Sequence, residues 1–481
     1  MKTSLSSFAL AALIAPAAWA SVLTVGPDYK RPDAPDAPIY RDTSPNVAGS
    51  ASDPTPQLSP DWWRTFNDPA LNELETRALA ANQDLRAALA RVQQARAVAG
   101  VARADYLPSL SLDPSVSRDR TSRTLDNPLP VTPSIIHRLP LDLTWELDLF
   151  GRVRRLNEST RAELSAAGAT FEAARLSLTA EVATTHFTLR ALDRELNVVN
   201  STAGLRRDAL KLVQSRLNGG TANDLDLARA ETELATTEAD AASLAIRRSA
   251  TQNALAVLLG EAAPSFDLSD SGSSLSALSS QLPPIPAGLP SALLSRRPDI
   301  VAAERQLAAA NARIGVAKAA FFPAISLTGS AGYASADISN LFKSDSRLWS
   351  IGPSLYLPIF QGGRNRANLA NARAVFEENV AAYRQSVLIA FREVQDALTA
   401  SRLLVDQSAA QSRAVASARR GADLAQKRYD AGYVSYLEVV DAQRTALDVE
   451  RADAQLAGQR WVTEIALIKA LGGGWQQSPT S

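Results

Sequence analysis

The sequence predicts an α+β membrane protein that contains an internal duplication. Residues 100–112, which begin Gly-Val-Ala-Arg-Ala, return as residues 315–327, which begin Gly-Val-Ala-Lys-Ala, and residues 216–220 return as residues 428–432. The period is roughly 210 residues, far beyond the 20–50 residues of a solenoid repeat, so one large module is present twice. Alternating apolar patterns typical of strands and seven-residue patterns typical of long helices recur in both copies.

The first 20 residues have the pattern of a secretory signal peptide. Lys2 precedes an apolar stretch over residues 8–20, which ends in Ala18-Trp19-Ala20, the small-x-small pattern of a cleavage site. This stretch is too short to span a bilayer as a helix, and no other stretch reaches 18 uncharged apolar residues. We therefore expect an exported protein in which any membrane crossing uses strands.

Composition excludes several classes of function. The chain has 481 residues and a formal net charge of zero, so it offers no basic face, and nucleic acid is not expected as a partner. The absence of cysteine excludes disulfides, thiolate nucleophiles and sulfur-ligated metals. The two histidines lack the spacing of a metal site, and neither a nucleophile elbow nor a phosphate-binding glycine loop occurs. We expect no enzyme activity, cofactor or metal.

Each copy opens with a helix and then changes to strands. Helices are predicted over residues 71–104 and 297–320, and Pro108 and Pro323 stop them where the apolar period becomes alternating.

The strongest strand signal lies over residues 139–150, where apolar residues occupy every second position as far as Leu149. Asp142, Glu146 and Asp148 fall between them, so these three carboxylates are predicted on one polar face that lines a lumen. At about 12 residues, the segment is long enough for a tilted membrane strand, which needs ~9–11.

The second copy alternates in the same way over residues 325–333 and 351–359, so each copy supplies one long hairpin. A soluble sandwich would also alternate. Only about four strands are found, whereas membrane barrels start at about eight. Several chains would have to pool their hairpins.

Very long helices follow Gly151 and the glycine pair at 362–363. Apolar residues step mostly by seven over residues 178–217 and 369–404, which is typical of coiled-coil seams. A helix over residues 153–217 would measure ~100 Å, enough to reach across a periplasm.

Short glycine-containing breaks end both long helices, and new helices are predicted over residues 225–259 and 435–471. Each pair is expected to form an antiparallel hairpin with its tip at the break. The tip residues are Asn218, Gly219, Gly220, Asp430, Ala431, Gly432 and Tyr433.

Five short motifs follow one another in a fixed order. They are Trp-Glu-Leu-Asp-Leu-Phe-Gly-Arg at 145–152, Arg-Arg-Pro-Asp-Ile at 296–300, Ala-Ala-Phe-Phe-Pro at 319–323, Leu-Pro-Ile-Phe at 357–360 and Asp-Ala-Gln-Arg at 441–444. Because it carries these motifs in this order, the chain resembles the outer membrane factors of tripartite efflux systems, the TolC-like channels. The resemblance is to the NodT-type branch, which works with resistance-nodulation-division pumps, and it runs from Gly26 to Trp475.

The resemblance implies a homotrimer in which three protomers give four strands each to a 12-stranded outer-membrane β-barrel on a long periplasmic α-helical barrel. It implies as partners a periplasmic adaptor (membrane fusion) protein, an inner-membrane resistance-nodulation-division pump and outer-membrane lipids, in a Gram-negative bacterium. The expected parts are a signal peptide at 1–20, an N-terminal extended and equatorial segment at 21–70, a first repeat at 71–260, a linker belt at 261–290, a second repeat at 291–475 and a tail at 476–481.

The resemblance also places a gate at the periplasmic helix tips. Family members close like an iris, through rings that correspond here to Leu437 and Asp441, with Arg444 as a latch one turn along. Three-fold symmetry would bring three Asp441 carboxylates together, where they repel one another and attract a cation. The alternative for Asp441 is an ordinary solvated helix charge. The hairpin tips are expected to contact the adaptor, although Tyr433 could instead pack within its hairpin.

One position departs from the family pattern. Many members of this branch carry a lipid-modified cysteine about three residues before the Gly-Pro-Asp-Tyr segment at 26–29, and this chain has Leu23 there. Lipidation is therefore not expected.

Three kinds of cargo are compatible with this resemblance: drugs and other small amphiphiles, metal cations, and proteins secreted by a type I system. Met1 is the only methionine, so the chain lacks the thioether relay that a copper exporter favours, and small-molecule efflux leads. A soluble coiled-coil scaffold is the alternative of a different class, but it leaves the signal peptide and both alternating hairpins unexplained.

Overall fold

The computed structural model describes residues 24–35, 40–41, 58–120, 122, 124, 134–268, 285 and 293–475. The predicted signal peptide, Leu23, most of the linker belt and the tail lie outside these residues. The chain divides into two compact units, which are described separately. The first takes in residues up to 33, 91–168 and 302–383, and the second takes in 34–90, 169–301 and 384 onward.

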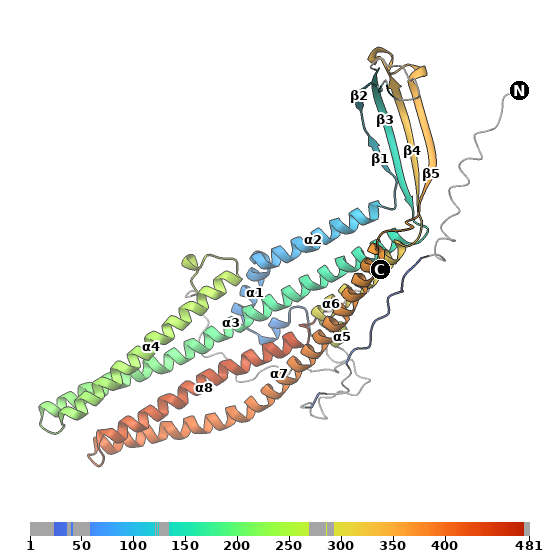
Figure 1. The fold of residues 1–481 in the computed structure, drawn as a ribbon. Helices are drawn as coiled ribbons and strands as arrows, with labels where there is room; N and C mark the ends of the chain where they lie inside the picture. The colour runs from blue at the N-terminus through green and yellow to red at the C-terminus, as the bar shows by residue number, and fades with distance from the viewer. Residues whose placement is uncertain are drawn as a thin grey trace. The chain divides into compact units, whose positions relative to one another are not determined.

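The first unit contains one antiparallel sheet (Figure 1). Its strands are β1 (Ser109–Leu112), β2 (Ser115–Asp119), β3 (Ser134–Leu147), β4 (Ala324–Ser335) and β5 (Arg347–Tyr356). β1 and β2 pair with different halves of β3, β3 pairs with β4, and β4 pairs with β5. Because β1 and β2 both pair with β3, the five described strands form a sheet that is four strands wide, and β2 is a strand that the sequence did not predict.

The strand register separates an apolar face of the sheet from a polar face. Residues directly opposite one another point to the same face. One row across the sheet is Leu112, Leu141, Ala331 and Trp349, and the next is Leu110, Leu143, Gly329 and Ile351. The alternating rows are Ser111, Asp142, Ser330 and Ser350, and Ser109, Thr144, Thr328 and Gly352. Large apolar side chains on the first face are exposed, Trp349 by 78%, which fits contact with lipid.

The helices repeat in pairs of equal length. α2 (Gln83–Ala104) and α6 (Pro298–Ala319) have 22 residues each, and they lead into β1 and β4. α3 (Arg152–Asn218) and α7 (Arg364–Asp430) have 67 residues each, and α4 (Asp224–Leu258) and α8 (Tyr436–Ala470) have 35 each. These three matched pairs of helices agree with the predicted duplication.

The prediction of one continuous helix over residues 71–104 is wrong. The structure has α1 (Pro69–Ala81) and α2, separated at Asn82, whose backbone is extended. The Asn82 side-chain oxygen accepts a hydrogen bond from Leu85 N at 2.9 Å and so caps α2, while its amide donates to Leu258 O at 2.9 Å. Buried Asn82 thus interrupts the predicted helix and caps the start of α2.

An extended N-terminal segment packs against helices of the first unit. Gly26 has a φ of +108°, and a Cβ on it would lie 2.5 Å from Gly315 Cα of α6. Asn311 Nδ2 donates to Pro27 O at 3.0 Å, and Tyr29 Oη donates to Glu304 Oε1 at 2.7 Å. Close backbone contact and side-chain hydrogen bonds therefore hold this segment along α6.

The second unit has an aromatic core. Trp62, Trp63 and Phe66 of the 3₁₀ helix η3 (Trp62–Phe66) pack with Phe187 of α3 and Trp461 of α8, whose rings stack at 4.6 Å. The other short helices among the described residues are η4 (Ala263–Ser265), α5 (Leu293–Arg296), η7 (Ile338–Asn340) and η8 (Ser344–Ser346). Within the described ranges, no helix is long and apolar enough to cross a membrane.

Candidate functional site

The three predicted gate residues lie in the first turns of α8, on its exposed side. Leu437 is 41% exposed, and Asp441 and Arg444 are exposed as well. Leu437 and Asp441 are four residues apart, so they lie on one helix face. The residues between them that point inward, Val439 and Val440, are buried in the hairpin core.

Apolar packing fixes the gate end of α8 to its neighbours in the second unit. Tyr429 of α7 and Tyr436 of α8 pack with ring centroids 5.4 Å apart, in a cluster that also contains Val213 of α3 and Ala230 of α4. Arg216 stacks over Tyr429 at 4.4 Å. Tyr433, by contrast, is 80% exposed at the turn and is not part of this core.

Glycine backbone conformations shape both hairpin tips. Asn218 and Asp430 are the last residues of α3 and α7. Gly220 and Gly432 then adopt φ values of 71° and 78°, the left-handed region that disfavours other residues. Tyr433 N donates to Arg428 O at 2.9 Å, which closes the second tip over the end of its helix.

A buried carboxylate below the gate holds three helices together. Glu233 of α4 is ion-paired with Arg206 of α3 at 3.0 Å, and both side chains are almost completely buried. Arg206 also donates to Glu233 O at 2.9 Å and to the Thr237 hydroxyl. Arg444 of α8, which is half exposed, reaches the other oxygen of Glu233. The predicted latch residue is therefore joined to a buried charge pair between α3 and α4.

A second ionic cluster lies seven residues further along. Arg451 is paired with Glu195 of α3 at 3.1 Å and with Asp240 of α4 at 2.9 Å. Because Arg451 and Asp240 each follow Arg444 and Glu233 by one heptad, the two clusters repeat on the same helix faces. Sequence reasoning missed Glu233 and Glu195. The seven-residue spacing of charges on α4 and α8 could have found Glu233, whereas Glu195 lies on α3, outside this pattern.

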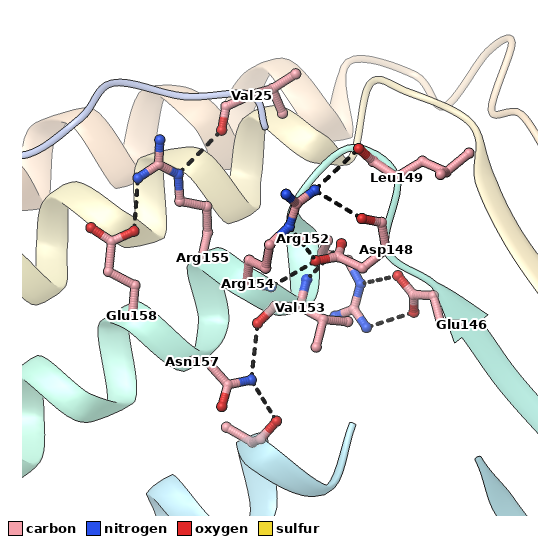
Figure 2. Close-up of polar contacts among 11 residues, drawn as sticks. Val25, Glu146, Asp148, Leu149, Arg152, Val153, Arg154, Arg155, Asn157 and Glu158 are labelled. Carbon is pink, nitrogen blue, oxygen red and sulfur yellow. Dashed lines mark hydrogen bonds and ion pairs between the residues drawn. The ribbon is translucent and has the colours of Figure 1, made fainter. Parts of the chain in front are cut away.

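The transition from β3 to α3 in the first unit contains the other predicted site residues (Figure 2). Glu146 lies in β3, where its row continues through Ser326 and Ser354. Its carboxylate accepts two hydrogen bonds from Arg152, at 2.8 and 2.6 Å. Asp142 lies four residues earlier in the parallel polar row and takes no part in this transition.

The prediction that Asp148 belongs to the strand is wrong. β3 ends at Leu147, and the Asp148 carboxylate accepts hydrogen bonds from Val153 N at 3.0 Å and Arg154 N at 2.8 Å (Figure 2). The Arg154 side chain also donates to Asp148 Oδ2 at 3.2 Å. Asp148 therefore satisfies the free N–H groups at the start of α3, as a capping residue does.

We expect Asp148→Ala to lower the stability of the protein by about 1–2 kcal/mol, the usual cost of removing a helix cap. Two backbone N–H groups and the Arg154 guanidinium would lose their common acceptor. Thermal unfolding followed by circular dichroism at the helical band measures the change. Asp142→Ala is the matched control, and an equal loss in both variants would contradict the capping role.

His186 has a structural role in the second unit. Its Nε2 lies 2.8 Å from Asp68 Oδ2, and the other Asp68 oxygen accepts hydrogen bonds from Ala70 N and Leu71 N at the start of α1. Although burial opposes ionisation, these hydrogen bonds and His186 lower the pKa of Asp68 to about 2. Among the residues with described positions, no group of three His, Asp or Glu side chains could hold a metal ion.

The comparisons of this chain with known proteins all identify the same family. A family model described as outer membrane efflux protein matches residues 74–261 and 289–473. The chain is 38% identical to the solvent efflux pump outer membrane protein SrpC of Pseudomonas putida, over 94% of this chain and 95% of that protein. It is 36% identical to the cation efflux system protein CusC of Escherichia coli K12, over 94% and 96%. The crystal structure of the Campylobacter jejuni CmeC outer membrane channel superposes with a TM-score of 0.87 at 26% identity, over 95% and 96%.

Proposed function

Because the chain belongs to the outer membrane efflux protein family, we propose that three copies of it form the exit duct of a tripartite efflux system. The protein is located in the outer membrane of a Gram-negative bacterium and extends into the periplasm. Small molecules would pass through it passively from the periplasm to the outside.

The sheet of the first unit carries this proposal. It is four strands wide, with an exposed apolar face and a polar face of serine, threonine and Asp142. Its edge strands, β1 with β2 on one side and β5 on the other, have no further partner among the described residues. An open edge with an exposed apolar face is unstable in water and in lipid, so joining edges among three copies into a 12-stranded barrel is the favourable solution.

The proposed partners are the periplasmic adaptor and the inner-membrane resistance-nodulation-division pump. In the second unit, a groove of about 490 Å³ lies between α3, α7 and α8. Leu205, Leu212 and Ala446 give it an apolar floor, and Arg419 and Glu450 lie at its edge. An amphipathic helix of an adaptor fits such a groove. The exposed tips, with Tyr433 at their surface, would extend the contact.

Small amphiphilic molecules are the proposed cargo. SrpC is named for solvent efflux and CusC for cation efflux, so members of this family serve both kinds of pump. Met1 is the only methionine of this chain, which favours small molecules over copper. Substrate choice would rest mainly with the pump.

Reconstitution of the purified protein tests the proposed duct. We expect a heat-labile trimer on a gel after extraction from outer membranes, and discrete ion conductance in planar bilayers. A protein that stays monomeric in lipid, or gives no conductance even with the gate variants described next, would refute the proposal.

We expect Asp441→Ala combined with Leu437→Ala to raise the single-channel conductance several-fold. Both residues lie on one exposed face of α8, so a three-fold arrangement would make one ring of carboxylates and one apolar ring. Asp448→Ala, one heptad further from the tip and also exposed, is the matched control. Conductance equal to that of the wild type would remove the gate assignment and leave the duct intact.

A further inference from the structure

A pocket of about 340 Å³ lies in the first unit, beside the end of the sheet. It is lined by residues from four segments that converge there: the N-terminal segment, the turn before β1, α3 and α6. The residues that matter for its chemistry are Tyr29, Tyr106, Arg154, Glu158, Arg161 and Arg305. Trp145 Nε1 of β3 donates to Tyr106 O at 3.1 Å, which fixes this wall of the pocket to the sheet.

The positive charge available to a ligand comes chiefly from Arg161. Arg154 is engaged by Asp148, and Arg305 lies 2.8 Å from Glu304. The Glu158 carboxylate is paired with Arg155 at 2.7 Å. Arg161 is exposed and has no ion pair with any described residue. Among the arginines that line the pocket, Arg161 is therefore the guanidinium without an ion pair to a described residue.

Two tyrosines complete the wall, and one of them, Tyr106, can donate a hydrogen bond to a ligand. Burial raises the pKa of both Tyr29 and Tyr106, so each hydroxyl remains protonated at neutral pH. Tyr29 uses its proton on Glu304 at 2.7 Å, whereas Tyr106 can donate into the pocket. Ala162 and Ala308 supply apolar surface between the polar groups. A ligand with an anionic group and an adjoining apolar part matches this composition.

The pocket opens on the face of α3 that carries the N-terminal segment. Arg154, Glu158, Arg161 and Ser165 recur every three or four residues, so they share one face of the helix. Arg155 at the edge of this face contacts Val25 O and Asp28. In the proposed duct, an extended segment laid across the helices belongs outside, because inside it would obstruct the passage. The pocket would thus face lipid at the periplasmic border of the membrane.

From this placement we infer that the pocket binds the phosphodiester of a phospholipid headgroup in the periplasmic leaflet of the outer membrane. Arg161 and Arg305 bind the phosphate oxygens, the Tyr106 hydroxyl donates to one of them, and the acyl chains continue along the apolar face of the sheet. The inference rests on the proposed function, since it requires the strands to cross the membrane. It adds to the barrel a specific attachment that does not depend on acylation.

Native mass spectrometry of the delipidated full-length protein in detergent tests the inference. The probes are dihexanoyl-phosphatidylglycerol, inorganic phosphate and a dihexanoyl-glycerol that lacks the headgroup. We expect phosphatidylglycerol to be retained and Arg161→Ala and Arg161→Gln to weaken its binding roughly tenfold, as for the loss of a charge-assisted hydrogen bond. Arg96→Ala, an exposed arginine of α2 outside the pocket, should bind as the wild type does.

Equal retention by the wild type and both Arg161 variants, or an equal loss in Arg96→Ala, would overturn the inference. Retention of the glycerol without its headgroup, at the same affinity, would also overturn it. If inorganic phosphate binds as tightly as the lipid, the pocket is a phosphate site and the lipid assignment is wrong. Conductance of the same preparations separates the two proposals, because a conducting protein without selective lipid binding refutes only the headgroup site.

Discussion

Glu233→Ala is expected to destabilise the helical hairpins and to raise conductance. Glu233 is the common partner of Arg206, which is almost fully buried, and of Arg444 on the gate face of α8. Removing the carboxylate leaves the Arg206 charge buried without an ion pair, which costs about 3–5 kcal/mol. It also releases Arg444, so the gate end of α8 loses its ionic contact with α4. Thermal unfolding and single-channel recording measure the two effects.

Glu238→Ala is the matched control for this prediction. Glu238 lies on the same helix and is paired with Arg207 of α3 at 2.7 Å, but both side chains are half exposed. An exposed pair contributes at most about 1 kcal/mol, so this variant should keep the stability and conductance of the wild type.

Arg444→Ala separates the latch from the buried charge. Glu233 keeps its pairing with Arg206 in this variant, so stability should fall much less while conductance still rises. Equal destabilisation by Glu233→Ala and Glu238→Ala would contradict the role assigned to Glu233. Unchanged conductance in both Glu233→Ala and Arg444→Ala would contradict the latch.

Periodicity in the sequence was sufficient to predict the main elements. Alternation and heptads depend on neighbours within one strand or helix, so the duplicated helices and the four-strand width could be predicted without tertiary information. The same rule fails where a polar side chain ends an element by binding backbone. Asp148 continues the alternation of β3 in the sequence, but its carboxylate caps α3.

Long-range contacts explain what the sequence could not predict. Asn82 fits an amphipathic helical pattern, yet its amide binds Leu258 O, 176 residues away. In the sequence, Glu233 looks like an ordinary charged residue on a helix surface. In the structure it is ion-paired with Arg206 of α3 and Arg444 of α8. In both cases the deciding partner lies far from the residue in the sequence, outside the local pattern.

Glu75→Gln is expected to make the protein more stable at neutral pH. Glu75 of α1 is completely buried, and neither carboxylate oxygen has a hydrogen-bond partner among the residues that the structure describes. Burial raises its pKa from 4.5 to about 9, so the folded protein holds a proton on Glu75 that the unfolded chain releases at pH 7. Between these two pKa values stability falls as pH rises, by about 1.4 kcal/mol per pH unit. At pH 7 the accumulated cost is about 3 kcal/mol.

A neutral glutamine removes this dependence, since neither the folded nor the unfolded chain then exchanges a proton at residue 75. Unfolding midpoints between pH 5 and pH 9 should therefore fall less steeply for Glu75→Gln than for the wild type, and the two proteins should differ most at high pH. Glu73→Gln is the control, because Glu73 lies on the same helix but is 71% exposed beside Arg77. Parallel pH profiles for the wild type and Glu75→Gln would show that Glu75 is ionised in the folded protein, and the buried site would then have to contain water or a cation that stabilises the carboxylate.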